Sequence, residues 1–155
     1  MKTGFSLIIM VSIMVSCTGN HQSLEQKHPP ISINGTWKLI SGTTIQNGDT
    51  TVTYYTKNLS FIKIINDSHF AFLNHDLTKG KDSTAAFSAG GGRYTLKDNL
   101  YTEHLEYCSD RQWEANDFTF SVSVKNDTLI QQGIEKVENA GINQINTEKY
   151  IRLKN

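Results

Sequence analysis

The segment from Tyr101 to Tyr107 holds the residues whose types and spacing best suit a binding site. Aromatic and polar residues alternate here, so an extended strand would place Tyr101, Glu103, Leu105 and Tyr107 on one face. A single carboxylate among aromatic side chains is typical of a small-molecule pocket, in which apolar walls enclose a ligand and a few polar groups orient it. Glu103 is therefore expected either to orient a ligand or to form a structural ion pair with a buried arginine.

Catalytic chemistry finds less support in the sequence. His69, His75 and His104 carry metal-ligating nitrogens, but their spacing matches no compact metal motif. Glu103 and Glu106 should point to opposite faces of their strand, which prevents them from acting as an acid–base pair on one substrate. We predict no catalytic residue, no metal and no cofactor. An enzyme using Glu103 or His104 would need both groups in one cleft.

Short alternating runs, separated by turn residues, must position these side chains. The clearest is Phe118–Val124, where apolar and polar residues alternate. The other expected strands are Trp37–Ile40, Leu59–Ile65, His69–Leu73, Thr84–Ser88, Arg93–Leu96, Leu100–Tyr107, Thr128–Gln132 and Lys149–Leu153. Helical turns are conceivable only at Ser109–Ala115 and Glu135–Asn139. Seven to nine such strands indicate a sandwich or a barrel. We favour an all-β, antiparallel, up-and-down barrel of about eight strands, with little or no helix.

Three consecutive glycines, Gly90–Gly92, suggest a phosphate-binding loop. Such a loop needs a helix N-terminus after it, whereas Arg93–Leu96 has the pattern of a strand. We therefore predict a bend or bulge, where side chains would crowd.

The N-terminus predicts export. Lys2 and the apolar run Phe5–Val15 precede Ser16 and Cys17, the order of a secretory signal. Residues 14–17 resemble the lipobox of bacterial lipoproteins, which implies cleavage after residue 16 and lipidation of Cys17. The predicted division is a signal peptide at 1–16, a flexible tether at 17–32 and a barrel domain at 33–155. The expected location is the cell envelope, with a lipid in the membrane; without lipidation the protein would be secreted.

Charge, length and cysteine content restrict the expected partners, the number of domains and the disulfides. The chain has 155 residues, with 15 Lys and Arg against 15 Asp and Glu. This balance argues against nucleic acid as a partner, and the length suits one domain. Removing the first 16 of the 155 residues leaves 139. Of the two cysteines, Cys108 alone remains once Cys17 is lipidated, so no intramolecular disulfide is expected.

Several stretches resemble an uncharacterised family of bacterial secreted lipocalin-like proteins. Gly35-Thr36-Trp37 matches the glycine-x-tryptophan signature of lipocalins, and Arg152 lies where such barrels place an arginine over that tryptophan. The longer similar stretches are Lys63–Phe70, Gly90–Leu96, Tyr101–Tyr107 and Glu148–Arg152. The resemblance implies a lipocalin-like barrel behind a signal peptide, with Trp37 and Arg152 as a structural pair that closes it. It implies no reaction.

Two functions follow as expectations. The first is a non-catalytic envelope lipoprotein that binds a small, partly apolar or amphipathic molecule in the barrel lumen. The candidate lumen residues are Phe70, Tyr94, Tyr101, Glu103, Phe120 and Arg152. The alternative is a packed barrel that binds a protein or glycan through an exposed aromatic patch including Tyr54, Tyr55 or Trp113. The sequence leaves the oligomeric state open.

Overall fold

The computed structural model describes residues 31–83 and 85–154. The predicted signal peptide, and the tether up to residue 30, lie outside the described residues. The strands are β1 (Gly35–Gln46), β2 (Asp49–Tyr54), β3 (Leu59–Ile65), β4 (His69–Asp76), β5 (Phe87–Lys97), β6 (Leu100–Cys108), β7 (Asn116–Lys125), β8 (Thr128–Val137) and β9 (Ile142–Arg152). Two short 3-10 helices, η1 (Arg111–Trp113) and η2 (Glu138–Ala140), complete the described secondary structure.

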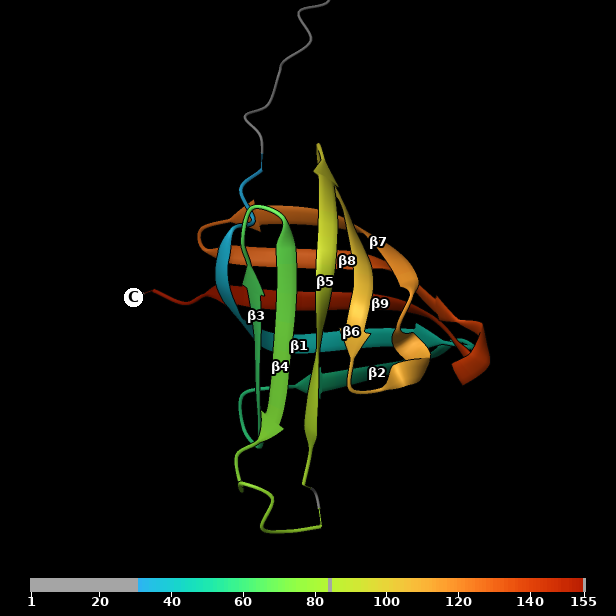
Figure 1. The fold of residues 1–155 in the computed structure, drawn as a ribbon. Helices are drawn as coiled ribbons and strands as arrows, with labels where there is room; N and C mark the ends of the chain where they lie inside the picture. Colours follow the sequence, from blue (N-terminus) through green and yellow to red (C-terminus); the bar gives the residue numbers. More distant parts are fainter. Residues whose placement is uncertain (1–30, 84, 155) are drawn as a thin grey trace, which may run out of the picture.

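The strands form a closed barrel. Each strand from β3 to β8 pairs antiparallel with the next, and β1 pairs with both β3 and β9, so eight strands close on themselves. The extra strand, β2, pairs with the second half of β1. In Figure 1, β3–β6 cross in front of β7, β8, β9 and β1. The prediction of an all-β, up-and-down antiparallel barrel of about eight strands is confirmed. None of the described helices is long and apolar enough to cross a membrane.

Three strand predictions need correction. We missed β2 because nearly all of its residues are exposed and no apolar alternation marks it; the Asn47-Gly48 turn before it, with φ of 53° and 89°, was the available signal. β5 runs unbroken through the glycines that we expected to separate two strands. β9 begins at Ile142 rather than Lys149, because its first half buries polar side chains that conceal the pattern.

The triple glycine creates the predicted bulge. The register of β5 against β6 shifts between Gly91 and Gly92. Gly92 must lack a side chain, because a Cβ there would collide with the backbone oxygen of His104. After this shift, the side chains of β6 point to the opposite faces from those that simple alternation predicts. Leu105 precedes the shift and is buried, whereas Tyr107, which we placed on the same face, follows it and is 68% exposed.

One end of the barrel is packed solid, and we call it the closed end. Its buried side chains include Ile33, Trp37, Ile65, Phe70, Tyr101, Phe120, Val122, Leu129 and Tyr150. Trp37 is fully buried, and its indole Nε1 donates a hydrogen bond of 2.7 Å to the Ile33 carbonyl oxygen. Arg152 covers the other side, with its Cζ 4.0 Å from the centroid of the Trp37 ring. The backbone of Gly35, at φ 135°, leaves room for the Arg152 guanidinium, which donates to the Asn34 carbonyl oxygen.

Candidate ligand-binding cavity

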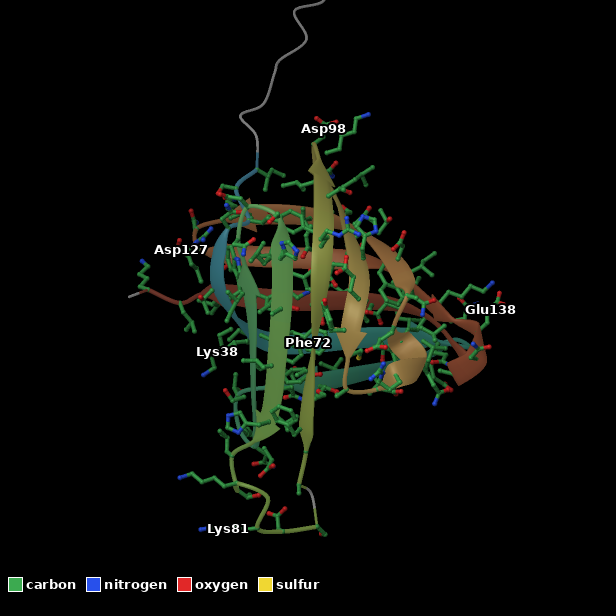
Figure 2. All side chains as sticks on the ribbon, in the orientation of Figure 1. Lys38, Phe72, Lys81, Asp98, Asp127 and Glu138 are labelled. Atoms are coloured by element: carbon green, nitrogen blue, oxygen red, sulfur yellow. The ribbon has the colours of Figure 1, made fainter. Side chains whose placement is uncertain are left out.

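The opposite half of the barrel is hollow. A cavity of about 340 Å³ lies between the closed end and the rim formed by Ser109, Asp110 and η1. Its lining residues are Tyr55, Phe61, Lys63, Phe72, Asn74, Ser88, Glu103, Leu105, Cys108, Ser109, Asp110, Trp113, Phe118, Gln131, Glu135 and Glu148. In Figure 2, the cavity-lining residue Phe72 lies near the centre of the molecule, whereas Asp98, Asp127 and Glu138 lie around the edge. A cavity of this size suits a small organic molecule.

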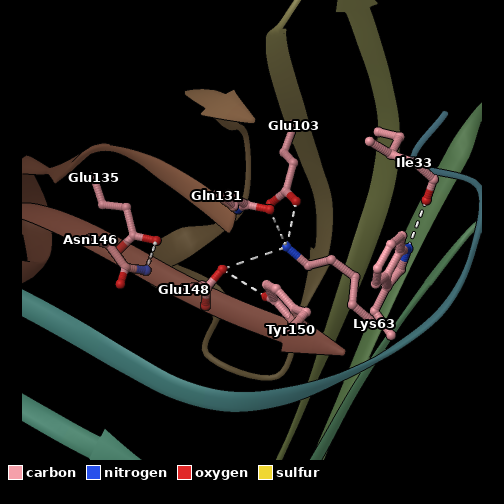
Figure 3. Close-up of polar contacts among 9 residues, drawn as sticks. Ile33, Lys63, Glu103, Gln131, Glu135, Asn146, Glu148 and Tyr150 are labelled. Atoms are coloured by element: carbon pink, nitrogen blue, oxygen red, sulfur yellow. Dashed lines mark hydrogen bonds and ion pairs between the residues drawn. The ribbon is translucent and has the colours of Figure 1, made fainter. Parts of the chain in front are cut away.

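A buried lysine forms the floor of this cavity. Lys63 projects inward from β3 and is 3% exposed. It lies on the same face of the strand as the inward-facing Phe61 and Ile65. Its Nζ lies 2.7 Å from Glu103 Oε1 on β6, 3.1 Å from Gln131 Oε1 on β8 and 3.8 Å from Glu148 Oε2 on β9 (Figure 3). Four strands therefore contribute to one polar cluster in the middle of the barrel.

The protonation of this cluster follows from burial and charge. Burial alone would lower the pKa of Lys63, but the carboxylates of Glu103 and Glu148 outweigh burial and raise it. Burial also raises the pKa of Glu103; Lys63 opposes that rise and Glu148 adds to it. The two carboxylates therefore favour the charged form of Lys63. Glu148 also accepts a hydrogen bond of 2.7 Å from the Tyr150 hydroxyl.

Glu135 adds a further carboxylate to the lining, away from Lys63. Its two oxygens accept hydrogen bonds of 2.9 Å from Asn146 Nδ2 and 2.8 Å from Gln144 Nε2. Burial raises the pKa of Glu135, and repulsion by Glu148 adds to the rise. Within the described part of the chain, Glu135 has no ion-pair partner. Among the described lining residues, three glutamates thus face one lysine.

Aromatic rings form the walls above this floor. Phe61 stacks on Phe72 with ring centroids 5.6 Å apart, and Tyr55 meets Phe61 edge-on at 5.7 Å. On the other side, Trp113 of η1 packs against Phe118 at 5.7 Å. Burial, with the nearby Glu148 and Glu135, raises the pKa of Tyr55 and keeps its hydroxyl protonated at neutral pH. The cavity therefore combines flat apolar walls with a charged floor.

An unsatisfied polar atom also lines the cavity. The Asn74 amide donates a long hydrogen bond of 3.4 Å to Ser88 Oγ, but its buried Oδ1 has no hydrogen-bond partner among the described residues. A buried acceptor left unpaired costs roughly 1–3 kcal/mol. A ligand with a hydrogen-bond donor would remove that cost.

The rim of the hollow half is held by two loops. Asp76, at the end of β4, accepts hydrogen bonds from the Thr78 hydroxyl at 2.6 Å and from the backbone N–H groups of Gly80 and Ala86 at 2.9 and 3.0 Å. These donors hold the pKa of Asp76 well below its usual range. On the other side, Glu114 accepts the Cys108 backbone N–H at 2.9 Å and so fixes η1 against β6.

The predicted lumen residues divide between the two halves. Glu103 lines the cavity. Phe70, Tyr101 and Phe120 lie in the packed closed end, and the Tyr94 ring lies against Tyr101 with its hydroxyl donating to the Asn66 carbonyl oxygen. Arg152 covers Trp37 outside the cavity.

The sequence reasoning missed three of the floor residues. Glu135 and Glu148 lie outside the expected strands Thr128–Gln132 and Lys149–Leu153, which are shorter than β8 and β9. Lys63 had a usable signal, since it falls between two inward-facing apolar residues of Leu59–Ile65. The expected partner of Glu103 was an arginine; it is this lysine.

The histidine and acidic residues considered for catalysis lie elsewhere. His104 Nδ1 is 2.8 Å from Asp117 Oδ1, and Glu106 pairs with Arg93 at 2.6 Å, both on the outside of the barrel. His104 therefore shares no cleft with Glu103, which faces inward. In residues 31–83 and 85–154, no group of three or more His, Cys, Asp or Glu side chains is placed to hold a metal ion.

Known proteins offer a structural likeness without a sequence match. No family model matches the sequence, and no curated protein matches it. A solved structure of an uncharacterized protein from Bacteroides eggerthii DSM 20697 is similar, with a TM-score of 0.45 and 12% identity, covering 77% of this chain and 98% of that one.

Proposed function

We propose that this protein is a non-catalytic, lipocalin-like binding protein of the cell envelope, which holds a small amphipathic molecule in the hollow half of its barrel. The observation that carries the proposal is the cavity of about 340 Å³ with aromatic walls and a polar floor. A barrel selected only for stability would fill this half with apolar side chains, as it fills the closed end, because close packing stabilises a folded protein.

The alternative of a surface interaction module has less support. It requires a contiguous exposed aromatic patch at Tyr54, Tyr55 or Trp113. Of these, Tyr54 is exposed, whereas Tyr55 and Trp113 are partly buried and line the cavity. Two of the three aromatic residues that motivated this alternative therefore line the cavity instead of forming an exposed patch.

Native mass spectrometry of the purified 139-residue form tests the binding proposal. We expect a population heavier than the polypeptide by one small molecule, which is lost on collisional activation. A Phe72→Trp variant, which adds bulk at the cavity wall, should lower that population, while Phe87→Trp, at an exposed position of β5, should leave it unchanged. If the protein is always free of adducts and binds nothing from an extract of its own cells, the proposal is wrong.

The envelope anchor is a separate part of the proposal. It rests on Cys17 and the preceding apolar run, and a lipid at this position would tether the barrel to a membrane. Feeding the producing cells a labelled fatty acid should label the wild type and the Cys108→Ser variant but leave Cys17→Ser unlabelled. Label retained in Cys17→Ser would contradict the anchor.

A further inference from the structure

The charge of the cavity floor narrows the class of ligand. Among the lining residues that the structure describes, Glu103, Asp110, Glu135 and Glu148 carry carboxylates and Lys63 alone carries a cation. Lys63 is committed to Glu103, at 2.7 Å, and lies 3.8 Å from Glu148. The positive charge of Lys63 is therefore paired within the cavity floor, and Glu135 faces the cavity without a cationic partner among the described residues.

Hydrogen bonding shows which acid is open to a ligand. The donors to Glu135 are the neutral amides of Asn146 and Gln144, and those amides hold its carboxylate in place without neutralising it. Asn74 Oδ1, from the opposite side of the barrel, is another acceptor without a donor. Glu135 and Asn74 Oδ1 are therefore two acceptors of the cavity that a donor-bearing ligand would satisfy.

The walls distinguish an organic cation from a bare ion. Phe61, Phe72 and Trp113 present ring faces and edges to the same cavity. Aromatic rings attract a positive charge by about 0.5–2 kcal/mol, and they also pack against the apolar body that carries it. A purely apolar molecule would leave the Glu135 carboxylate with its two amide donors but without a positive partner.

We infer that the cavity selects an organic cation, a small molecule with a protonated amine that pairs with Glu135 and Glu148 and an apolar body that packs against Phe61, Phe72 and Trp113. This inference rests on the proposed function and adds to it the charge and shape of the ligand. A neutral or anionic molecule of the same shape would meet either an unpaired carboxylate or direct repulsion.

A charge series on one carbon skeleton tests the inference. We would measure the binding of 4-phenylbutylamine, 4-phenylbutanol and 4-phenylbutanoate to the purified mature protein by isothermal titration calorimetry at pH 7. We expect the amine to bind about tenfold more tightly than the alcohol, because a charge-assisted hydrogen bond is stronger than a neutral one by about 1 kcal/mol or more. The carboxylate should bind most weakly.

Two variants assign the selectivity to the cavity. Glu135→Gln should reduce the preference for the amine about tenfold, while affinity for the alcohol stays within twofold. Glu138→Gln is the matched control, since Glu138 lies on η2 with an exposed side chain paired to Lys136. It should behave like the wild type. Melting curves of both variants establish that each is folded.

The outcomes separate the two proposals. If all three probes bind with equal affinity, or the carboxylate binds best, the inferred charge of the ligand is wrong and binding in the cavity stands. If no probe binds, the inferred ligand class is wrong, and native mass spectrometry decides separately whether the proposed function stands. Selectivity that persists in Glu135→Gln would also overturn the assignment to this carboxylate.

Discussion

Phe70 and Phe72 lie two residues apart on β4 and point into the same barrel, yet their surroundings differ. Phe70 is 3% exposed and packs edge-on against Tyr101 in the closed end. Phe72 stacks on Phe61 and lines the cavity. Lys63, the cross-strand partner of Phe72 on β3, pairs with Glu103 and brings its Nζ to 5.8 Å from the centroid of the Phe70 ring. The same strands therefore build a packed core and a cavity that meet at a buried ion pair.

The difference assigns stability to one half of this small barrel and the proposed binding to the other. The closed end concentrates buried apolar area, whose removal from water contributes about 25 cal/mol per Å². The hollow half forgoes that contribution and holds its shape by polar contacts, with Asp76 fixing one loop and Glu114 fixing η1. Substitutions in the two halves should therefore have different consequences.

The largest expected effect separates the two phenylalanines. Phe70→Ala should lower the free energy of unfolding by about 3–5 kcal/mol, because it opens a cavity in a packed core. Phe72→Ala should cost clearly less, since its ring already borders empty space, but it should weaken binding of 4-phenylbutylamine. Urea denaturation of both variants measures the difference. Equal losses of stability would mean that the half around Phe72 is as tightly packed as the closed end.

The next effect concerns the ion pair at which the halves meet. Lys63→Met should destabilise the barrel by about 3 kcal/mol, because it leaves the buried Glu103 without its partner. The double variant Lys63→Met with Glu103→Leu should recover most of that loss, since the unpaired charge is gone. Denaturation of the single and double variants gives the coupling. A double variant no more stable than the single one would show that the ion pair is not the source of the effect.

The smallest effect is a pH dependence in the hollow half. The groups facing Glu135 are Glu148, Glu103, Lys63 and Tyr55, with the amides of Asn146 and Gln144. Since the pKa of Glu135 is raised in the folded state, the folded protein binds this proton more tightly than the unfolded chain does. Ionising Glu135 therefore costs stability as the pH rises from the ordinary glutamate range through its folded pKa.

The Glu135→Gln variant removes this cost. Relative to wild type, its stability should be greater at pH 8 than at pH 4, where Glu135 is protonated in both states. The raised pKa of Glu103 acts in the same direction and is present in both proteins. Urea midpoints of wild type and variant across this range provide the measurement. A difference independent of pH would contradict the assigned shift.

The sequence predicted the architecture better than the cavity. Alternation along Phe118–Val124 and in the first half of Leu100–Tyr107 follows directly from an inside and an outside face, so the barrel could be inferred. The position of the hollow half depends on which inward-facing residues meet across the barrel, and this follows from register. Tyr101 and Glu103 share a face on β6, yet one is in the core and the other on the cavity floor.

Polar inward-facing residues were the main obstacle. Glu135, Asn146 and Glu148 occupy inner positions of β8 and β9 that a pattern of apolar alternation does not identify. Two local details were also not predicted. The bulge at Gly91 and Gly92 was expected, but its effect of turning Tyr107 outward was not. The exposed strand β2 lacks any apolar pattern. Under the proposed function, the inward-facing polar residues take the place of core residues because they line a ligand cavity.

The two tryptophans allow one experiment to compare the halves directly. Trp37 is buried in the closed end with its indole N–H bonded to Ile33, whereas Trp113 lies on η1 at the cavity wall. In a ¹H–¹⁵N correlation spectrum, each indole N–H gives its own signal. On titration with 4-phenylbutylamine, the account predicts that the Trp113 signal moves progressively while the Trp37 signal stays in place. Movement of Trp37 alone, equal movement of both, or no movement of either would contradict a binding cavity confined to the hollow half.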